Sequence, residues 1–156
     1  MKNIVLTRID DRLLHGQVMV SWIPFLEINE VIIIDDEYAD DEFMSALIVE
    51  AAPEALNVKV LSVEDSAKYI LSGDDDSRVL LISRNIENIN NLIEIGVIIN
   101  KINVGGVGSL EGRKKYVNSI HMSENELNLL REISRKGIAV EIQMLPKDKA
   151  IEIKQV

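Results

Sequence analysis

Cysteine is absent from the sequence, so disulfide bonds, thiolate zinc sites and cysteine nucleophiles are excluded. Only three prolines and eight glycines occur, and aromatic residues make up 4% of the chain, which excludes collagen-like and low-complexity architectures. The apolar runs are short, and the one at residues 31–34 is far below the about 20 residues that a membrane span needs. Hydrophobic residues still make up 47% of the 156 residues, enough for one core. We therefore expect a single domain over residues 1–156 that does not insert into a membrane.

Positive charge is also scarce. The chain has 17 Lys and Arg against 26 Asp and Glu, which gives a formal net charge of −9. Because no basic stretch of useful length offsets this charge, we expect no nucleic-acid partner and no adhesion to anionic lipid. Residues 1–4 carry one positive charge without a signal-peptide pattern, which predicts a cytoplasmic protein.

Short apolar runs alternate with longer amphipathic stretches along the chain. The runs are continuous, which is typical of strands covered on both faces. The expected strands are residues 3–8, 31–35, 58–61, 79–83, 101–104 and 138–144. The expected helices are residues 16–26, 40–52, 63–72, 86–95 and 123–136, and a short β-like segment lies near residues 119–122. This alternation predicts an α/β fold with a parallel sheet and helices on both faces.

Polar residues follow four of the expected strands, at residues 9–17, 35–37, 83–85 and 105–109. In open α/β sheets, ligands bind outside the carboxyl ends of the strands. The sequence therefore predicts a site at this edge of the sheet.

His15 is the residue at this edge best suited to chemistry. It directly precedes a predicted helix, whose N-terminal N–H groups and dipole favour an anion. Arg12, with Arg8 as a second candidate, would donate charge-assisted hydrogen bonds to phosphoryl oxygens. Asp10 or Asp11 would hold the imidazole in one tautomer. Because a neutral imidazole is a nucleophile near pH 7, this group of residues predicts phosphoryl transfer at His15.

Residues 8–18 read Arg-Ile-Asp-Asp-Arg-Leu-Leu-His-Gly-Gln-Val, and Trp22 follows them. This run resembles the N-terminal signature of the IIB components of the mannose/fructose/sorbose class of the bacterial phosphoenolpyruvate:sugar phosphotransferase system. The resemblance continues through residues 29–36, 103–106 and 140–146, and it covers most of the chain.

The resemblance implies a cytoplasmic phosphocarrier with a three-layer α/β/α sandwich and a mainly parallel central sheet. In the family, a IIA partner passes a phosphoryl group to a histidine of IIB. IIB then phosphorylates a sugar delivered by the membrane subunits IIC and IID. The matching histidine is His15, which would be both nucleophile and carrier. Arg12 would neutralise phosphoryl charge, while Asp10 or Asp11 would orient the ring or support Arg12.

The ends of the fourth and fifth expected strands supply further candidates. Ser83 and Arg84 would complete the phosphoryl site, unless they serve only as a helix cap and a solvent-facing charge. Gly105 and Gly106, with Gly108, would let the adjacent loop approach closely or supply N–H donors, unless they form only a tight turn.

Two other functions fit the alternating pattern. A phosphoaspartate receiver would use Asp10 and Asp11, but it needs an Asp after the third strand, where residues 61–63 read Leu-Ser-Val, and a Lys after the fifth. A nucleotide-binding module would use residues 105–108, but Glu111 stands at the third glycine of Gly-x-Gly-x-x-Gly and no Gly-Lys-Ser/Thr motif occurs.

A third interpretation is a non-catalytic interaction domain in which His15 is structural, as we interpret His121. The residues around His15 and the acidic run at residues 73–77 match no strong metal motif, so we expect neither a metal ion nor a cofactor. A homodimer stays open, and the sequence does not identify the sugar.

Overall fold

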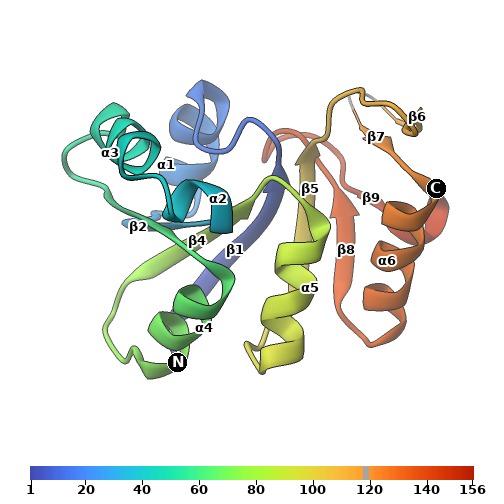
Figure 1. The fold of residues 1–156 in the computed structure, drawn as a ribbon. Coiled ribbons are helices and arrows are strands. Elements are labelled where there is room, and N and C mark those ends of the chain that lie inside the picture. Colours follow the sequence, from blue (N-terminus) through green and yellow to red (C-terminus); the bar gives the residue numbers. More distant parts are fainter. Residues whose placement is uncertain (118–119) are drawn as a thin grey trace.

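The computed structural model describes residues 1–117 and 120–156. Within these ranges, seven strands form one sheet in the order β3-β2-β4-β1-β5-β8-β9. The strands are β1 (Asn3–Asp10), β2 (Glu30–Ile34), β3 (Asn57–Leu61), β4 (Arg78–Ser83), β5 (Lys101–Gly106), β8 (Ala139–Ile142) and β9 (Ile151–Glu152). Neighbouring strands are parallel except at the edge, where β9 pairs antiparallel with β8. The predicted mainly parallel sheet is confirmed (Figure 1).

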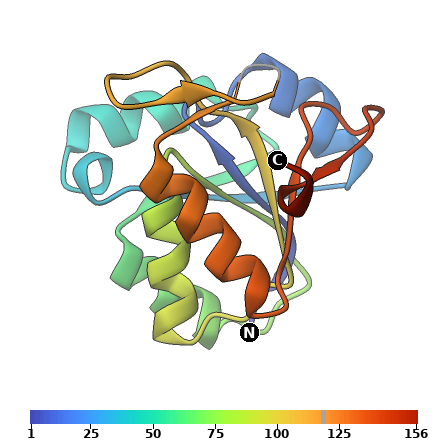
Figure 2. The same cartoon turned by 90° about the vertical axis from the view of Figure 1, so that its right-hand side faces the viewer.

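Helices cover both faces of this sheet (Figures 1 and 2). One face carries α4 (Val63–Ser72), α5 (Ile86–Ile95) and α6 (Glu124–Arg135). The other carries a π-helical segment (Val18–Trp22) with α1 (Ile23–Phe25), together with α2 (Asp36–Ala39) and α3 (Glu42–Ala51). Along β2, Ile32 and Ile34 join the first core while Val31 and Ile33 join the second. Because each face of the strand is buried, continuous apolar runs are required, and the expected three-layer sandwich is confirmed.

The boundaries of the predicted helices and strands agree with the structure to within two residues. Side chains cap the helices as their sequences indicate: Ser62 accepts a hydrogen bond at the start of α4, and Ser123 forms a capping box with Glu126 at the start of α6. Of the short segment expected near residues 119–122, β7 (His121–Met122) is confirmed, whereas residue 119 lies outside the described residues.

Some elements have no clear signal in the sequence. They are α2, β9, the two-residue strand β6 (Lys114–Lys115) that pairs with β7, and a 3-10 helix at Ile153–Gln155. The π turn is a further difference, in which the N–H of Ile23 donates to the carbonyl of Val18. Pro24 follows directly, and a proline ring clashes with the carbonyl four residues earlier in a regular α-helix. The wider turn accommodates that ring.

The sheet brings the candidate residues together at one edge. β1 lies between β4 and β5, so that Ile9 is beside Ser83 and Asp10 is beside Gly106. Figure 1 shows the connections that follow these strands at the same end of the molecule. None of the helices within residues 1–117 and 120–156 combines the length and the apolar character of a membrane-spanning segment.

Candidate active site

The chain leaves the sheet at Asp10 and turns sharply into the loop that carries His15. The N–H of Leu13 donates to the carbonyl of Asp10 over 3.0 Å, which closes a four-residue turn. Leu13 has a φ of 55°, an uncommon left-handed conformation. Its buried side chain packs in the core between the sheet and the helices α1 to α3. The carbonyl of His15 accepts a hydrogen bond from Met19, so His15 lies at the start of the next helix as predicted.

The carboxylate of Asp10 is fully buried and accepts hydrogen bonds from several side chains of the site. Its Oδ1 accepts the main-chain N–H and the Nε–H of Arg12, both over 3.1 Å. Its Oδ2 accepts Nη2 of Arg12 over 3.2 Å and Nε of Arg8 over 3.3 Å. Nε2 of His15 lies 3.0 Å from the same Oδ2. The carboxylate of Asp10 thus contacts Arg8, Arg12 and His15, which were assigned to one site from the sequence.

The charge on Asp10 sets the tautomer of His15. Burial alone would raise the pKa of Asp10, but hydrogen bonds from Arg12 and His15 and the charge of Arg8 hold that pKa below its ordinary value. An ionised carboxylate only accepts hydrogen bonds, so Nε2 of His15 carries the proton. In the neutral ring, the lone pair is then on Nδ1. The side chain of His15 is 16% exposed, which gives the ring limited access to solvent.

Arg12 provides positive charge beside the ring. Its Nε and Nη2 are held by Asp10, while Nη1 reaches Gln17 over 3.4 Å. The side chain remains 43% exposed, so part of the guanidinium faces solvent. An oxyanion that approaches His15 would meet this cation, as predicted for Arg12.

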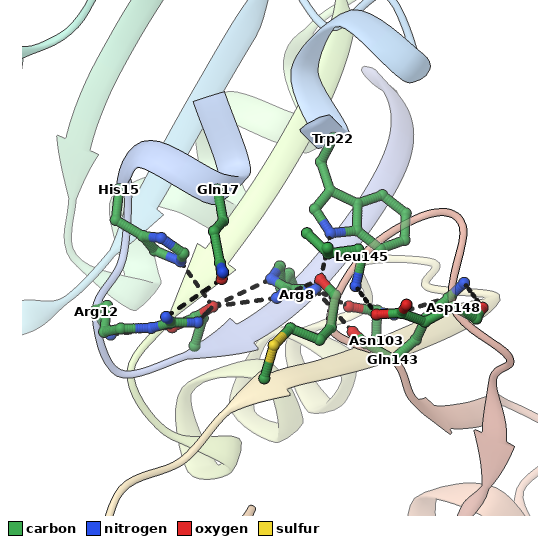
Figure 3. Close-up of polar contacts among 11 residues, drawn as sticks. Arg8, Arg12, His15, Gln17, Trp22, Asn103, Gln143, Leu145 and Asp148 are labelled. Carbon is green, nitrogen blue, oxygen red and sulfur yellow. Dashed lines mark hydrogen bonds and ion pairs between the residues drawn. The ribbon is translucent and has the colours of Figure 1, made fainter. Parts of the chain in front are cut away.

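Arg8 does not occupy the phosphoryl-contacting position expected of it, because its side chain is fully buried. It pairs with Asp10 over 3.2 Å, donates to Asn103, and donates to the carbonyls of Gln143 and Met144, each over 3.1 Å. Burial lowers the pKa of Arg8, although the charge of Asp10 acts in the opposite direction. The guanidinium also lies 5.4 Å from the ring centre of Trp22. Arg8 therefore supports Asp10 from within the protein, and Figure 3 shows its side chain between those of Arg12 and Asn103.

The glycines at the end of β5 and just after it lie close to side chains of the site. A Cβ at Gly105 would overlap the guanidinium of Arg8. A Cβ at Gly106 would lie 3.0 Å from Nη2 of Arg12, and one at Gly108 would lie 2.9 Å from Oδ2 of Asp11. The structure therefore shows the close approach expected of these glycines, and a Cβ at any of them would displace a neighbouring side chain.

The side chain of Asp11 makes no hydrogen bond to the imidazole or to the side chain of Arg12 among the described residues. It therefore takes neither role considered for it, orienting the ring or supporting Arg12. Its Oδ2 accepts the N–H of Gly108 over 2.7 Å, and its own N–H donates to the carbonyl of Gly106 over 2.9 Å. Asp11 thus fastens the His15 loop to the β5–β6 connection, whereas Asp10 orients the ring.

Residues 4–156 match the family described as PTS system sorbose subfamily IIB component. The chain belongs to this family. It is 34% identical to the PTS system fructose-specific EIIB component of Bacillus subtilis, over 100% of this chain and 96% of that protein. The crystal structure of manxB from Thermoanaerobacter tengcongensis superposes with a TM-score of 0.89 at 36% identity, covering 99% of this chain and 94% of that one. The IIBSor domain of the sorbose permease from Klebsiella pneumoniae also gives a TM-score of 0.89, at 27% identity, covering 97% and 94%.

Membership of the IIB family disfavours the receiver and nucleotide-binding alternatives. In this IIB component, the side chains of Ser83 and Arg84 have hydrogen-bond partners outside the group around His15. The hydroxyl of Ser83 donates to the carbonyl of Asn85, and Arg84 is held by Asp35 over 2.6 Å and by Glu37 over 3.3 Å. The hydrogen bond to Asp35 raises the pKa of Arg84. Arg84 therefore connects the ends of β2 and β4. Both residues have structural contacts, but not the ones considered for them, because Asn85 caps α5 and Arg84 is ion-paired instead of facing solvent alone.

Two residues in the stretches that carry the resemblance make contacts in this IIB site that were not predicted from the sequence. Asn103 is 1% exposed and binds Arg8, and Trp22 donates from Nε1 to the carbonyl of Met144 over 2.9 Å. A polar residue inside the apolar run at residues 101–104 was the available signal for Asn103, because a buried amide needs a partner. His121 lies apart, with Nδ1 3.3 Å from the carbonyl of Val107, which agrees with a structural role.

Proposed function

We propose that this IIB component accepts a phosphoryl group on Nδ1 of His15 from a IIA protein and transfers it to a sugar. The contact between Asp10 and Nε2 carries this proposal. It supports a neutral ring whose lone pair is on Nδ1, the nitrogen that can then attack phosphorus.

In the first step, a bond forms between Nδ1 of His15 and phosphorus as the bond to the donor histidine breaks. In the second step, the nitrogen–phosphorus bond breaks and its electron pair returns to Nδ1 of His15. The phosphoryl group passes to a sugar hydroxyl, whose proton is released to water. Such transfers depend on positioning and charge stabilisation more than on covalent assistance. The exposed part of Arg12 would stabilise the equatorial oxygens, and the helix that follows His15 adds N–H groups and a favourable dipole. These groups perform the transfer without a cofactor.

The other residues of the site act through His15 and Arg12. Asp10 positions His15 and Arg12, and Arg8 positions Asp10. Asp11 positions the loop itself.

A carrier of this kind works between a IIA donor and the membrane subunits IIC and IID, so we propose a cytoplasmic location for residues 1–156 as one IIB domain. Relatives are named for fructose, N-acetylgalactosamine, mannose and sorbose, and the proposal extends to a sugar without choosing among them.

The test is phosphorylation from phosphoenolpyruvate through the general carrier proteins and a cognate IIA, with intact mass as the readout. The wild type should gain one acid-labile phosphoryl group. His15→Ala should gain none. His121→Ala should still gain one, because the ring of His121 contacts the carbonyl of Val107 and not His15 or Asp10. The position of the phosphoryl group on the ring can be assigned by NMR of the phosphorylated protein. A folded wild type that an active IIA does not phosphorylate, or a phosphoryl group on Nε2, would contradict the proposal.

A further inference from the structure

Arg113 lies in the connection between β5 and β6 and makes two hydrogen bonds that tie this connection to α6. Its Nε donates to Oε1 of Glu126 over 2.9 Å, and its Nη1 donates to the carbonyl of Gly108 over 3.0 Å. The side chains of Arg113 and Glu126 are only 12% and 13% exposed. A charged pair that is largely shielded from water holds its geometry better than an exposed one.

Glu126 is itself a fixed point. The same Oε1 accepts the N–H of Ser123 over 3.3 Å, and the N–H of Glu126 donates to the hydroxyl of Ser123 over 3.1 Å, which completes the capping box of α6. That helix is anchored in the core by Leu127 and Leu130. Arg113 thus joins the β5–β6 connection to a rigid element.

The peptide groups of Gly108 are held from two sides. Its carbonyl accepts from Arg113, while its N–H donates to Asp11 over 2.7 Å. Asp11 also binds the carbonyl of Gly106, and Gly106 passes so close to Arg12 that no Cβ would fit without displacement. The position of residues 106–108 therefore determines how the loop with Arg12 and His15 is seated.

We propose that Arg113 is a positioning residue for phosphoryl transfer at His15 and acts through Gly108 and Asp11. This assignment rests on the proposed function of His15. Arg113 stabilises the part of the β5–β6 connection that lies beside Arg12. Figure 1 shows β6 and β7 at the same end of the sheet as the loop after β1. It makes no bond to the phosphoryl group.

Arg113→Met tests the assignment because it keeps the aliphatic stem and removes both hydrogen bonds. A misplacement of about 1 Å at a reacting group can cost about 100-fold, so we expect the saturating rate of transfer from phosphorylated IIA to fall by about 10- to 100-fold. The IIA concentration at half-saturation should stay within about threefold, because Arg113 is proposed to position and not to bind IIA. Arg113→Lys should recover part of the rate, since one ammonium can pair with Glu126 but does not reproduce the two-point contact.

Arg131→Met is the matched control. Arg131 is an arginine of α6 that likewise donates to a carbonyl, that of Val156, over 2.8 Å. Among the described residues, its side chain makes no hydrogen bond to the β5–β6 connection. Its transfer rate should equal that of the wild type. Thermal unfolding of every variant shows whether it is folded at the assay temperature. Should Arg113→Met fail to fold, Glu126→Gln takes its place, because the amide oxygen preserves the cap of α6 while the ion pair is lost.

Three results would overturn the assignment of Arg113. They are a rate within twofold of the wild type, an equal loss in Arg131→Met, or a change confined to half-saturation, which would make Arg113 a contact for IIA. A wild type that gains no phosphoryl group on His15 in the same experiment would instead overturn the proposed function, and the assignment with it.

Discussion

Replacing Asp10 with asparagine keeps the shape of the side chain and removes the charge on which both arginines and His15 converge. N–H groups of these three residues reach the carboxylate over 3.0 to 3.3 Å, and the carboxylate is fully buried. Asparagine would retain one acceptor oxygen and place an NH₂ group against the remaining donors. Arg8, which is also fully buried, would lose its counter-charge. Breaking a buried ion pair costs about 3–5 kcal/mol, a large part of the about 5–15 kcal/mol that stabilises a typical domain.

The effect on phosphoryl transfer has a separate cause. If the amide NH₂ faces Nε2 of His15, then Nε2 must accept and the proton moves to Nδ1. The nucleophilic lone pair would be lost from the nitrogen that we propose to be phosphorylated. Loss of a carboxylate that fixes a catalytic imidazole can cost about 10⁴-fold, so we expect a decrease of at least about 100-fold for Asp10→Asn.

Urea unfolding and single-turnover transfer from phosphorylated IIA measure the two effects independently. Asp76→Asn, in an exposed loop, is the matched control for both and should change neither. An Asp10→Asn protein that loses less than about 1 kcal/mol and transfers within threefold of the wild-type rate would refute both arguments.

Three further predictions follow from the same contacts. Because the pKa of Asp10 is depressed in the folded protein, its charge stabilises the fold above the unfolded pKa of about 3.9, and this contribution disappears as pH falls through the folded pKa. The difference in unfolding free energy between wild type and Asp10→Asn should therefore narrow in urea titrations below about pH 4. A difference that stays constant with pH would contradict this. Gly105→Ala should lower the free energy of unfolding by about 1–3 kcal/mol or more, because the added methyl overlaps Arg8, whereas Gly16→Ala meets open space among the described residues and should not destabilise by overlap. Trp22→Phe leaves a main-chain carbonyl without its indole donor and should cost about 1–3 kcal/mol in calorimetry; an unchanged melting temperature would show that water replaces the donor.

The fold was predictable because its signals are local and agree with one another. Residues 31–34 are apolar on both faces of the strand, a pattern that only a strand covered on both faces requires. Ser123 and Glu126 form the capping-box pattern that predicts the start of α6. The antiparallel β9 is only two residues long and depends on its pairing with β8, so nothing in its own sequence distinguishes it. The π turn does have a local signal in Pro24, but a proline can equally kink or end a helix, so the sequence alone does not select this kind of turn.

The candidate site was predictable as a place but less so as a set of contacts. The rule for strand ends brings His15, Asp10 and Gly106 to one edge, and the register of β1 with β5 agrees. The same rule does not say where a long side chain points. Arg84 therefore looked like a phosphate ligand, although Asp35 at the end of the adjacent strand holds it.

Arg8 shows how a simple physical argument could have improved that prediction. Side chains two residues apart on a strand share a face, so Arg8 and Asp10 lie together while Ile9 points to the other core. A charged residue inside a central strand must be buried with a partner, and Asp10 is the nearest one. Because Asp10 balances the charge of Arg8 internally, the second cation, Arg12, contributes net positive charge at the surface beside His15. Under the transfer proposed for His15, Arg12 would therefore be available to a phosphoryl group, and the buried Arg8 would contribute only through Asp10.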